Sequence, residues 1–338
     1  MGGRALKNTY TRRYERQEFE DVKNELFEVL SKSFVRYDIP RFFHNKETFG
    51  DIDIIVSMKG FNKNMREYIE ETFKPNEIFH NGNAWSFDYK ELQVDIMTCA
   101  PEDFDSNYHY LAFNDLGNFI GRLAQSIGMK YGQEGLWYNH YSDENTKDKI
   151  MVSKDYPKIF EFLGLDYDRW IEGFDTLEDI FEYVRTSYLF NPEMFQLHKL
   201  NKINRERNLK RASYMAFLEF IKNKAAHPDY SKSMVESRKK DVINVIRGYF
   251  PEAKIDLHLA EIAYKHARKN LIKQKFNGGI LMKKYGLKGK EIGEAIKYFK
   301  ASIFDNYGMS FDDFVIMYNQ EYILLNFEHY LKIGRFSN

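Results

Sequence analysis

Residues 47–56 read ETFGDIDIIV, and this stretch decides the fold. The alternation of acidic and aliphatic residues predicts a β-strand, because successive side chains of a strand point to opposite faces. Asp51 and Asp53 then share one face, and Ile52, Ile54 and Val56 share the other. Two neighbouring carboxylates repel each other, so one should take up a proton near neutral pH unless a divalent cation binds between them.

A third acid, Asp95, follows in the stretch QVDIM at residues 93–97. Residues 84–89 and 92–98 have strand patterns and are joined by two residues, which predicts a hairpin. We expect the strand of Asp95 to lie near that of Asp51 and Asp53. Carboxylate oxygens are the ligands that magnesium prefers, so these three acids are the predicted metal ligands and catalytic residues.

The remaining apolar spacing predicts an α+β protein, with a small mixed sheet followed by an all-helical carboxy-terminal region. Helical spacing surrounds the first strand, and beyond Ile150 the strand signals fade. We expect helices over residues 15–36, up to Pro75 and over 114–127, a glycine-rich loop from Gly128 to Tyr138, and helices at 242–249, 257–276, 290–304 and 311–333.

With 338 residues, the chain is long enough for two or three domains. We predict domains at 1–150, 151–250 and 251–338. The sequence has neither the hydrophobic segment of a signal peptide nor an apolar run long enough to cross a bilayer, so no membrane partner is expected. Cys99 is the only cysteine, so no intrachain disulfide can form and a cytoplasmic location is expected.

The stretch GDIDI at 50–54 followed by VDI at 94–96 resembles the active-site pattern of the polymerase-beta-like nucleotidyltransferase superfamily. The resemblance covers about the first 130 residues. The sequence also looks like a group of such proteins that is frequent in phages and large viruses. It implies a palm domain in which Asp51, Asp53 and Asp95 hold two magnesium ions. It also implies transfer of a nucleoside monophosphate from a triphosphate, with release of pyrophosphate.

The sequence departs from this family at the turn that grips the phosphates. Family members carry a Gly-Ser or Gly-Gly doublet shortly before the acidic pair, whereas residues 39–44 read IPRFFH. Gly2-Gly3 lies far upstream and needs an altered topology to reach the site. The stretch from Thr48 to Gly50 is the other candidate, and we predict that the nucleotide contacts Thr48, Gly50, Arg122 and Lys130.

Residues 276–296 are similar to a carboxy-terminal segment of CCA-adding tRNA nucleotidyltransferases and bacterial poly(A) polymerases. Gly286 and Gly289 permit a tight turn that a nucleic-acid backbone can approach. The resemblance implies an RNA partner, with tRNA favoured. An ordinary corner between two helices with solvated lysines remains the alternative. The predicted RNA-binding residues are Lys283, Lys284, Lys288 and Lys290.

The formal net charge is zero, but the charges are segregated. Residues 263–300 hold eleven Lys or Arg against two Glu, which is typical of a surface for a polyanion and also of solvated helix faces. A second basic stretch, from Lys199 to Arg211, allows the same two interpretations.

We therefore predict a magnesium-dependent enzyme that adds a nucleotide from ATP or CTP to an RNA 3′ end. Two alternatives are open. In the first, the acceptor is a hydroxyl of a protein or small molecule. In the second, the chain is a catalytically inactive nucleotidyltransferase fold that serves as an RNA-binding or regulatory module.

Overall fold

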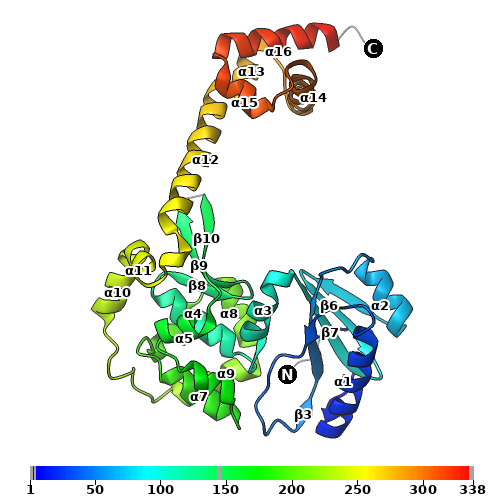
Figure 1. Cartoon of the computed structure of the whole chain (residues 1–338), viewed down its shortest axis with the longest axis vertical. Helices are drawn as coiled ribbons and strands as arrows, with labels where there is room; N and C mark the ends of the chain where they lie inside the picture. The colour runs from blue at the N-terminus through cyan, green and yellow to red at the C-terminus, as the bar shows by residue number, and fades with distance from the viewer. Residues whose placement is uncertain (1–2, 4, 143–145, 335–338) are drawn as a thin grey trace. The chain divides into compact units, whose positions relative to one another are not determined.

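The computed structural model describes residues 3, 5–142 and 146–334 of the chain (Figure 1). It divides into two compact units, residues 1–255 and 256–338. The first contains all the strands of the described residues, in a mixed sheet and two smaller sheets, and the second is helical. The expectation of an α+β protein is therefore confirmed.

The main sheet has five strands in the order β2-β4-β7-β6-β5. Strands β4 and β7 are parallel, and the other neighbours are antiparallel. The strand β6 and the strand β7 form the predicted hairpin. The bounds are Tyr37–Asp38 for β2, Asp51–Ser57 for β4, Ile78–Asn81 for β5, Ala84–Tyr89 for β6 and Leu92–Cys99 for β7.

One face of this sheet is covered by α1 (Arg16–Leu30) and α2 (Met65–Phe73) (Figure 1). Ile52 and Ile54 of β4 pack there with Phe19, which stacks on Phe49 at a ring separation of 3.8 Å. The prediction that Ile52, Ile54 and Val56 share a buried face is confirmed. The first helix ends at Leu30 and not at residue 36, because the chain turns there to bury Phe34.

Before the acids, a two-stranded ribbon pairs β1 (Tyr14–Glu15) with β3 (Thr48–Phe49). Residues 39–47, which lie between β2 and β3, form no helix or strand. At the end of β7, the short helix η1 (Pro101–Asp103) leads into α3 (Phe104–Leu111), whose Phe104 packs with Ile55 on the second face of the sheet.

The glycine-rich segment after α4 (Leu116–Ser126) is a sheet and not the expected loop. Strands β8 (Met129–Gly132), β9 (Gly135–Tyr141) and β10 (Lys147–Ser153) pair antiparallel. Gly132 and Gly135 flank a tight turn, and Gly135 has a φ of +108° that other residues rarely adopt. Tyr131, Leu136 and Ile150 are buried, so alternating side chains stabilise strands on both sides of the turn.

Aromatic residues form the core of the remaining part of the first unit. Phe119 of α4 packs against Phe217 at a ring separation of 4.1 Å, so segments on both sides of residue 150 share one core. The division into two compact units does not separate the residues before 150 from those after it, so the predicted domain border at 150 stays a prediction. The helices are α5 (Tyr156–Phe162), α6 (Tyr167–Glu172), α7 (Leu177–Arg185), η2 (Pro192–Phe195), η3 (Leu197–Lys199), α8 (Lys202–Leu209), α9 (Ala212–Ile221), α10 (Lys232–Lys240), α11 (Val242–Tyr249) and η4 (Pro251–Ala253).

The second unit has a core of its own, in which Phe276, Phe299, Phe314 and Phe327 are buried. The predicted helices are confirmed, except that residues 311–333 form two helices. The unit comprises α12 (Ile255–Lys275), α13 (Gly278–Tyr285), α14 (Lys290–Tyr307), α15 (Phe311–Met317) and α16 (Gln320–Gly334).

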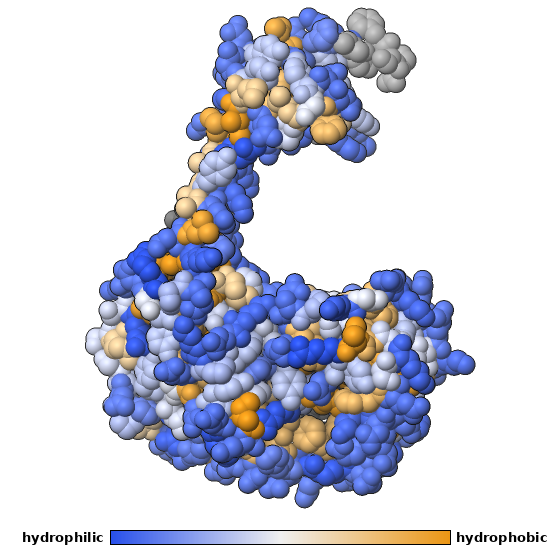
Figure 2. Space-filling model, in the orientation of Figure 1, coloured by the Kyte–Doolittle hydropathy of each residue, from blue (hydrophilic) through white to orange (hydrophobic). Residues whose placement is uncertain are grey.

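Within the described part of the chain, no helix is long and apolar enough to span a bilayer. On the face drawn in Figure 2, hydrophobic residues are scattered among hydrophilic ones.

Candidate metal centre and its cavity

The three predicted metal ligands lie together. Asp51 and Asp53 are on β4, and Asp95 is on the neighbouring parallel strand β7, in register with Asp53. One carboxylate oxygen from each residue lies within 4.8 Å of the others. The prediction that the three acids converge is confirmed, and together they can hold a metal ion.

Burial of the aliphatic residues explains why the acids meet. Ile52 and Ile54 of β4, together with Val94 and Ile96 of β7, are buried on the face under α1 and α2. A slip of one residue in either strand would expose these side chains and bury the acids, so the hydrophobic face fixes the register. The acids are consequently held on the opposite face at the same level of both strands.

The carboxylates destabilise one another in the absence of a cation. Burial, followed by the charges of Asp51 and Asp95, raises the pKa of Asp53 well above its ordinary value. Burial also raises the pKa of Asp95 to about 6 and raises the pKa of Asp51. A divalent cation would remove this repulsion, and a set of oxygen ligands alone suits a hard cation such as magnesium.

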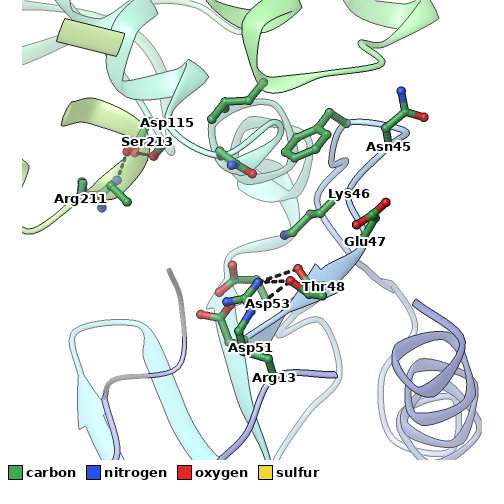
Figure 3. A pocket seen from close by; sticks show the side chains of 15 residues that line it. Arg13, Asn45, Lys46, Glu47, Thr48, Asp51, Asp53, Asp115, Arg211 and Ser213 are labelled. Carbon is green, nitrogen blue, oxygen red and sulfur yellow. Dashed lines mark hydrogen bonds and ion pairs between the residues drawn. The ribbon is translucent and has the colours of Figure 1, made fainter. Parts of the chain in front are cut away.

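Lys46 supplies positive charge to the acids from residues 39–47. Figure 3 shows its ammonium group pointing toward Asp51 and Asp53. The Nζ atom also lies 4.6 Å from the ring centre of Phe49. Burial lowers the pKa of Lys46, while the charges of Asp51 and Asp53 raise it. Lys46 is therefore a partly buried cation beside the candidate metal ligands.

Gly3, near the amino terminus, lies beside the acids. The backbone N–H of Gly3 donates to Oδ2 of Asp51 over 2.9 Å. Gly3 has a φ of +77°, and a Cβ atom there would lie 2.2 Å from the carbonyl oxygen of Gly50. Only glycine fits this close approach. Gly2, the other member of the doublet, lies outside the described residues.

A cavity of about 560 Å³ opens beside the acids. The predicted residues Thr48 and Gly50 line it, together with Lys46 and Arg13. Arg13 donates from Nε to the hydroxyl of Thr48 over 3.1 Å and from Nη2 to its carbonyl oxygen over 2.7 Å (Figure 3). The segment before β4 thus contributes two cationic side chains to the cavity.

The start of α9 forms another wall of this cavity, with Arg211 and Ser213. Asp115, which precedes α4, is buried and accepts hydrogen bonds from both the Arg211 guanidinium and the Ser213 hydroxyl (Figure 3). Because a buried carboxylate holds its orientation, Arg211 is a fixed cation in a cavity that also contains Asp51 and Asp53.

The structure does not bring Arg122 and Lys130 to this cavity. The Arg122 guanidinium donates to the carbonyl oxygen of Met194 over 3.1 Å from Nε. Arg122 lies seven positions after Asp115, about 10 Å farther along α4, and is not among the residues that line the cavity. Lys130 is exposed on β8 and is not among the residues that line the cavity. Lys46, Arg13 and Arg211 occupy the positions around the acids instead.

The four predicted RNA-binding lysines lie in the second unit, at the end of α13 and the start of α14. Lys283, Lys284, Lys288 and Lys290 are exposed, and Lys290 lies 3.8 Å from Glu294. Gly286 and Gly289 have φ values of +71° and +53°, so the expected tight turn between the two helices is present.

Sequence reasoning missed Arg13, Lys46, Asp115 and Ser213. The nearest signal was the basic stretch that ends at Arg211, although nothing in its pattern distinguished Arg211 from its neighbours. Lys46 stands five residues before Asp51 in a segment without periodicity.

No protein-family model matches the chain, and no curated protein matches it.

Proposed function

We propose that the protein is a magnesium-dependent nucleotidyltransferase that moves a nucleoside monophosphate from ATP or CTP to an acceptor hydroxyl. The observation that supports this most strongly is the convergence of Asp51, Asp53 and Asp95 within 4.8 Å on two parallel strands. Asp51 and Asp53 also border a cavity of about 560 Å³ that carries cationic side chains. A cavity of this size is within the usual range for sites that bind small molecules.

In this proposal Asp51 and Asp53 hold two magnesium ions, and Asp95 completes the ligands on the acceptor side. When bound, the ions stabilise the charge on the attacking and leaving oxygens. The protein's part is to place three oxygen ligands at one level of the sheet and to keep the reacting groups in register.

Lys46, Arg13 and Arg211 would contact the phosphates of the nucleotide. All three line the cavity, and two of them are fixed by partners within it: Arg13 by Thr48 and Arg211 by Asp115. An arginine that already has a fixed orientation loses less entropy when it binds a phosphate. These residues would replace the glycine doublet that is missing from residues 39–44.

We further propose that the acceptor is the 3′ end of an RNA, with tRNA favoured. The exposed lysines around the turn between α13 and α14 support this, because they present positive charge beside glycines that leave the backbone accessible. The acceptor can equally be a hydroxyl of a protein or of a small molecule, and the assay below separates these classes.

The test is to incubate the purified protein with magnesium, ATP or CTP labelled at the α-phosphate, and separate pools of tRNA, other RNA, protein and small molecules. We expect label in the RNA pool and release of pyrophosphate. Asp53→Asn should abolish transfer, whereas Asp38→Asn, which alters an exposed carboxylate on β2, should retain it. Equal transfer by wild type and Asp53→Asn would reject this site as the catalytic centre.

A second candidate function is a nucleotidyltransferase fold that binds without catalysis. The observation that favours it is that residues 39–47 form no helix, so this segment offers no helix amino terminus to receive phosphate. Calorimetry with ATP and magnesium distinguishes the two: absence of binding, with RNA binding intact, would support the binding module.

A further inference from the structure

Gln93 links two parts of the molecule that are distant in sequence. Its side chain is buried on β7, in register with Asp51 and two residues before Asp95 on the same face. The Nε2 atom donates to both oxygens of Asp95, over 3.0 Å to each. The Oε1 atom accepts from the backbone N–H of Ala5 over 2.9 Å and, more weakly, from that of Leu6 over 3.5 Å. Both ends of the amide are therefore used.

The segment that contains Ala5 is held by hydrogen bonds to other residues of the first unit at three places. Gly3 donates its backbone N–H to Asp51, and Ala5 donates to Gln93. Lys7 and Asn8 donate their backbone N–H groups to the carboxylate of Glu77, over 3.0 and 2.8 Å. The first two places lie at the candidate metal ligands, and the third lies away from them.

We propose that Gln93 is a positioning residue that holds the carboxylate of Asp95 for the cation, and that Ala5 fixes the orientation of the Gln93 amide. This inference rests on the metal site of the proposed function but does not require that nucleotide transfer occurs.

The two ends of an amide side chain have opposite hydrogen-bonding character. The NH₂ group can only donate, and the oxygen can only accept. The N–H of Ala5 therefore requires the oxygen of Gln93 at its end, which leaves the NH₂ group for Asp95. Without the N–H of Ala5, only the longer hydrogen bond from Leu6 holds the Gln93 oxygen. The amide can then rotate more readily and present its oxygen to the carboxylate, where the two would repel.

A neutral donor is well suited to this position. A lysine or arginine bound to Asp95 would compete with a cation for the carboxylate, whereas an amide fixes its orientation and leaves its charge unchanged. Gly3 acts on Asp51 in the same way, with a neutral backbone donor. Two of the three acids are thus oriented by neutral groups, each supported by the segment of Gly3 and Ala5.

The experiment measures binding of Mn²⁺ by electron paramagnetic resonance at pH 7.5, with thermal unfolding recorded separately without cation. Gln93→Leu removes the amide, and Ala5→Pro removes the nearer of its two backbone donors and leaves that of Leu6 at 3.5 Å. Loss of a group that orients a metal ligand commonly weakens metal binding about 10- to 100-fold. We expect at least a tenfold weaker affinity for Mn²⁺ in each variant, with a changed spectrum of the bound ion.

The double variant should bind Mn²⁺ no more weakly than Gln93→Leu alone, because both changes act on Asp95 through one amide. Asn76→Leu is the matched control. It removes an amide that donates to the buried carboxylate of Asp88 over 2.7 Å. Asp88 is the register partner of Gln93 on the adjacent strand β6 and is not one of the three acids. This variant should lower thermal stability and retain the affinity for Mn²⁺.

Different results separate this inference from the proposed function. Wild-type affinity and an unchanged spectrum in both Gln93→Leu and Ala5→Pro would overturn the inference alone, since a purely structural role predicts that result. A wild type that binds no Mn²⁺ would overturn the metal site and the inference with it. Mn²⁺ binding that depends on Gln93, in a protein without transfer activity, would support the inference and reject the proposed function.

Discussion

Asp53 and Asp95 are register partners on the parallel strands β4 and β7, so two carboxylates project from one sheet face at the same level. With Asp51 two residues before Asp53 on the same face of β4, the site concentrates negative charge where burial already disfavours it. This arrangement lowers the stability of the folded protein. The effect of the acids on the free energy of unfolding can therefore be measured without knowledge of the substrate.

Asp53→Asn should stabilise the metal-free protein at pH 7.5 to 8. The pKa of Asp53 is raised well above its ordinary value, so its charged form is disfavoured in the fold and a neutral amide removes that penalty. We expect a gain in the free energy of unfolding. Chemical denaturation in the presence of a chelator measures it, and a loss of stability would contradict this account.

The stability of the metal-free protein should depend on pH in a defined direction. The pKa of Asp95 is about 6 in the fold against an ordinary value of 3.8, so the folded state binds this proton more tightly than the unfolded state. The contribution of this group to stability is thus lost as the pH rises from about 4 through about 6. The raised pKa of Asp53 acts in the same direction.

Magnesium should reverse this loss, with a larger increase in melting temperature at pH 8 than at pH 5.5, because protons compete for the same oxygens at the lower pH. Thermal unfolding with and without magnesium measures the effect. A variant with Asn at positions 51, 53 and 95 serves as the reference for all other titrating groups. If its pH profile matches that of wild type, the three acids do not carry the dependence.

Gly3→Ala should impair the site more than it impairs the fold. The new Cβ would lie 2.2 Å from the Gly50 carbonyl oxygen, so the Gly3 N–H must move away from Asp51. Gly60 is the matched control, because it has the same φ of +77° but open space around its Cβ position. Both variants should lose about 1 kcal/mol of stability from the backbone conformation, and only Gly3→Ala should weaken Mn²⁺ binding severalfold.

Arg211→Met should weaken binding of ATP with magnesium about tenfold, as expected for loss of one charge-assisted contact of roughly 1.5 kcal/mol. Binding of adenosine should be unaffected, because the proposed contact is to phosphate. Lys210→Met, which changes the exposed neighbouring residue, provides the control. Calorimetry on the three proteins checks the prediction, and an equal loss for ATP and adenosine would assign Arg211 to the base or to folding.

Replacing Lys283, Lys284, Lys288 and Lys290 by Gln should weaken RNA binding and reduce its dependence on salt. Each lost phosphate contact lowers the slope of log affinity against log salt by about 0.7 for single-stranded RNA. Filter binding at several salt concentrations measures both quantities, and binding of ATP should not change. An unaltered salt slope would favour solvated lysines at an ordinary helical corner.

The sequence was most informative where alternation and burial act together. The pattern of Asp51, Ile52, Asp53 and Ile54 predicts a strand and its two faces, and the hairpin that carries Asp95 follows from its short link. These local features were enough to predict that the three acids converge. The helices of the second unit could also be predicted from the sequence, because their apolar spacing is regular.

Other parts of the site depend on contacts between residues that are distant in the sequence. No periodic pattern in the sequence indicates such contacts. Arg211 reaches the cavity through Asp115, 96 residues earlier, and Gly3 reaches Asp51 across 48 residues. The error over residues 128–138 has a different origin. Glycine-rich spacing predicts a loop there, whereas Gly132 and Gly135 flank the turn of a hairpin whose strands are buried on one side.

The separate core of residues 256–338 has an evolutionary consequence. A segment that buries its own phenylalanines can be exchanged by recombination without unpairing any strand of the segment before it. The helical unit can therefore be altered or replaced while the three acids of the sheet keep their positions.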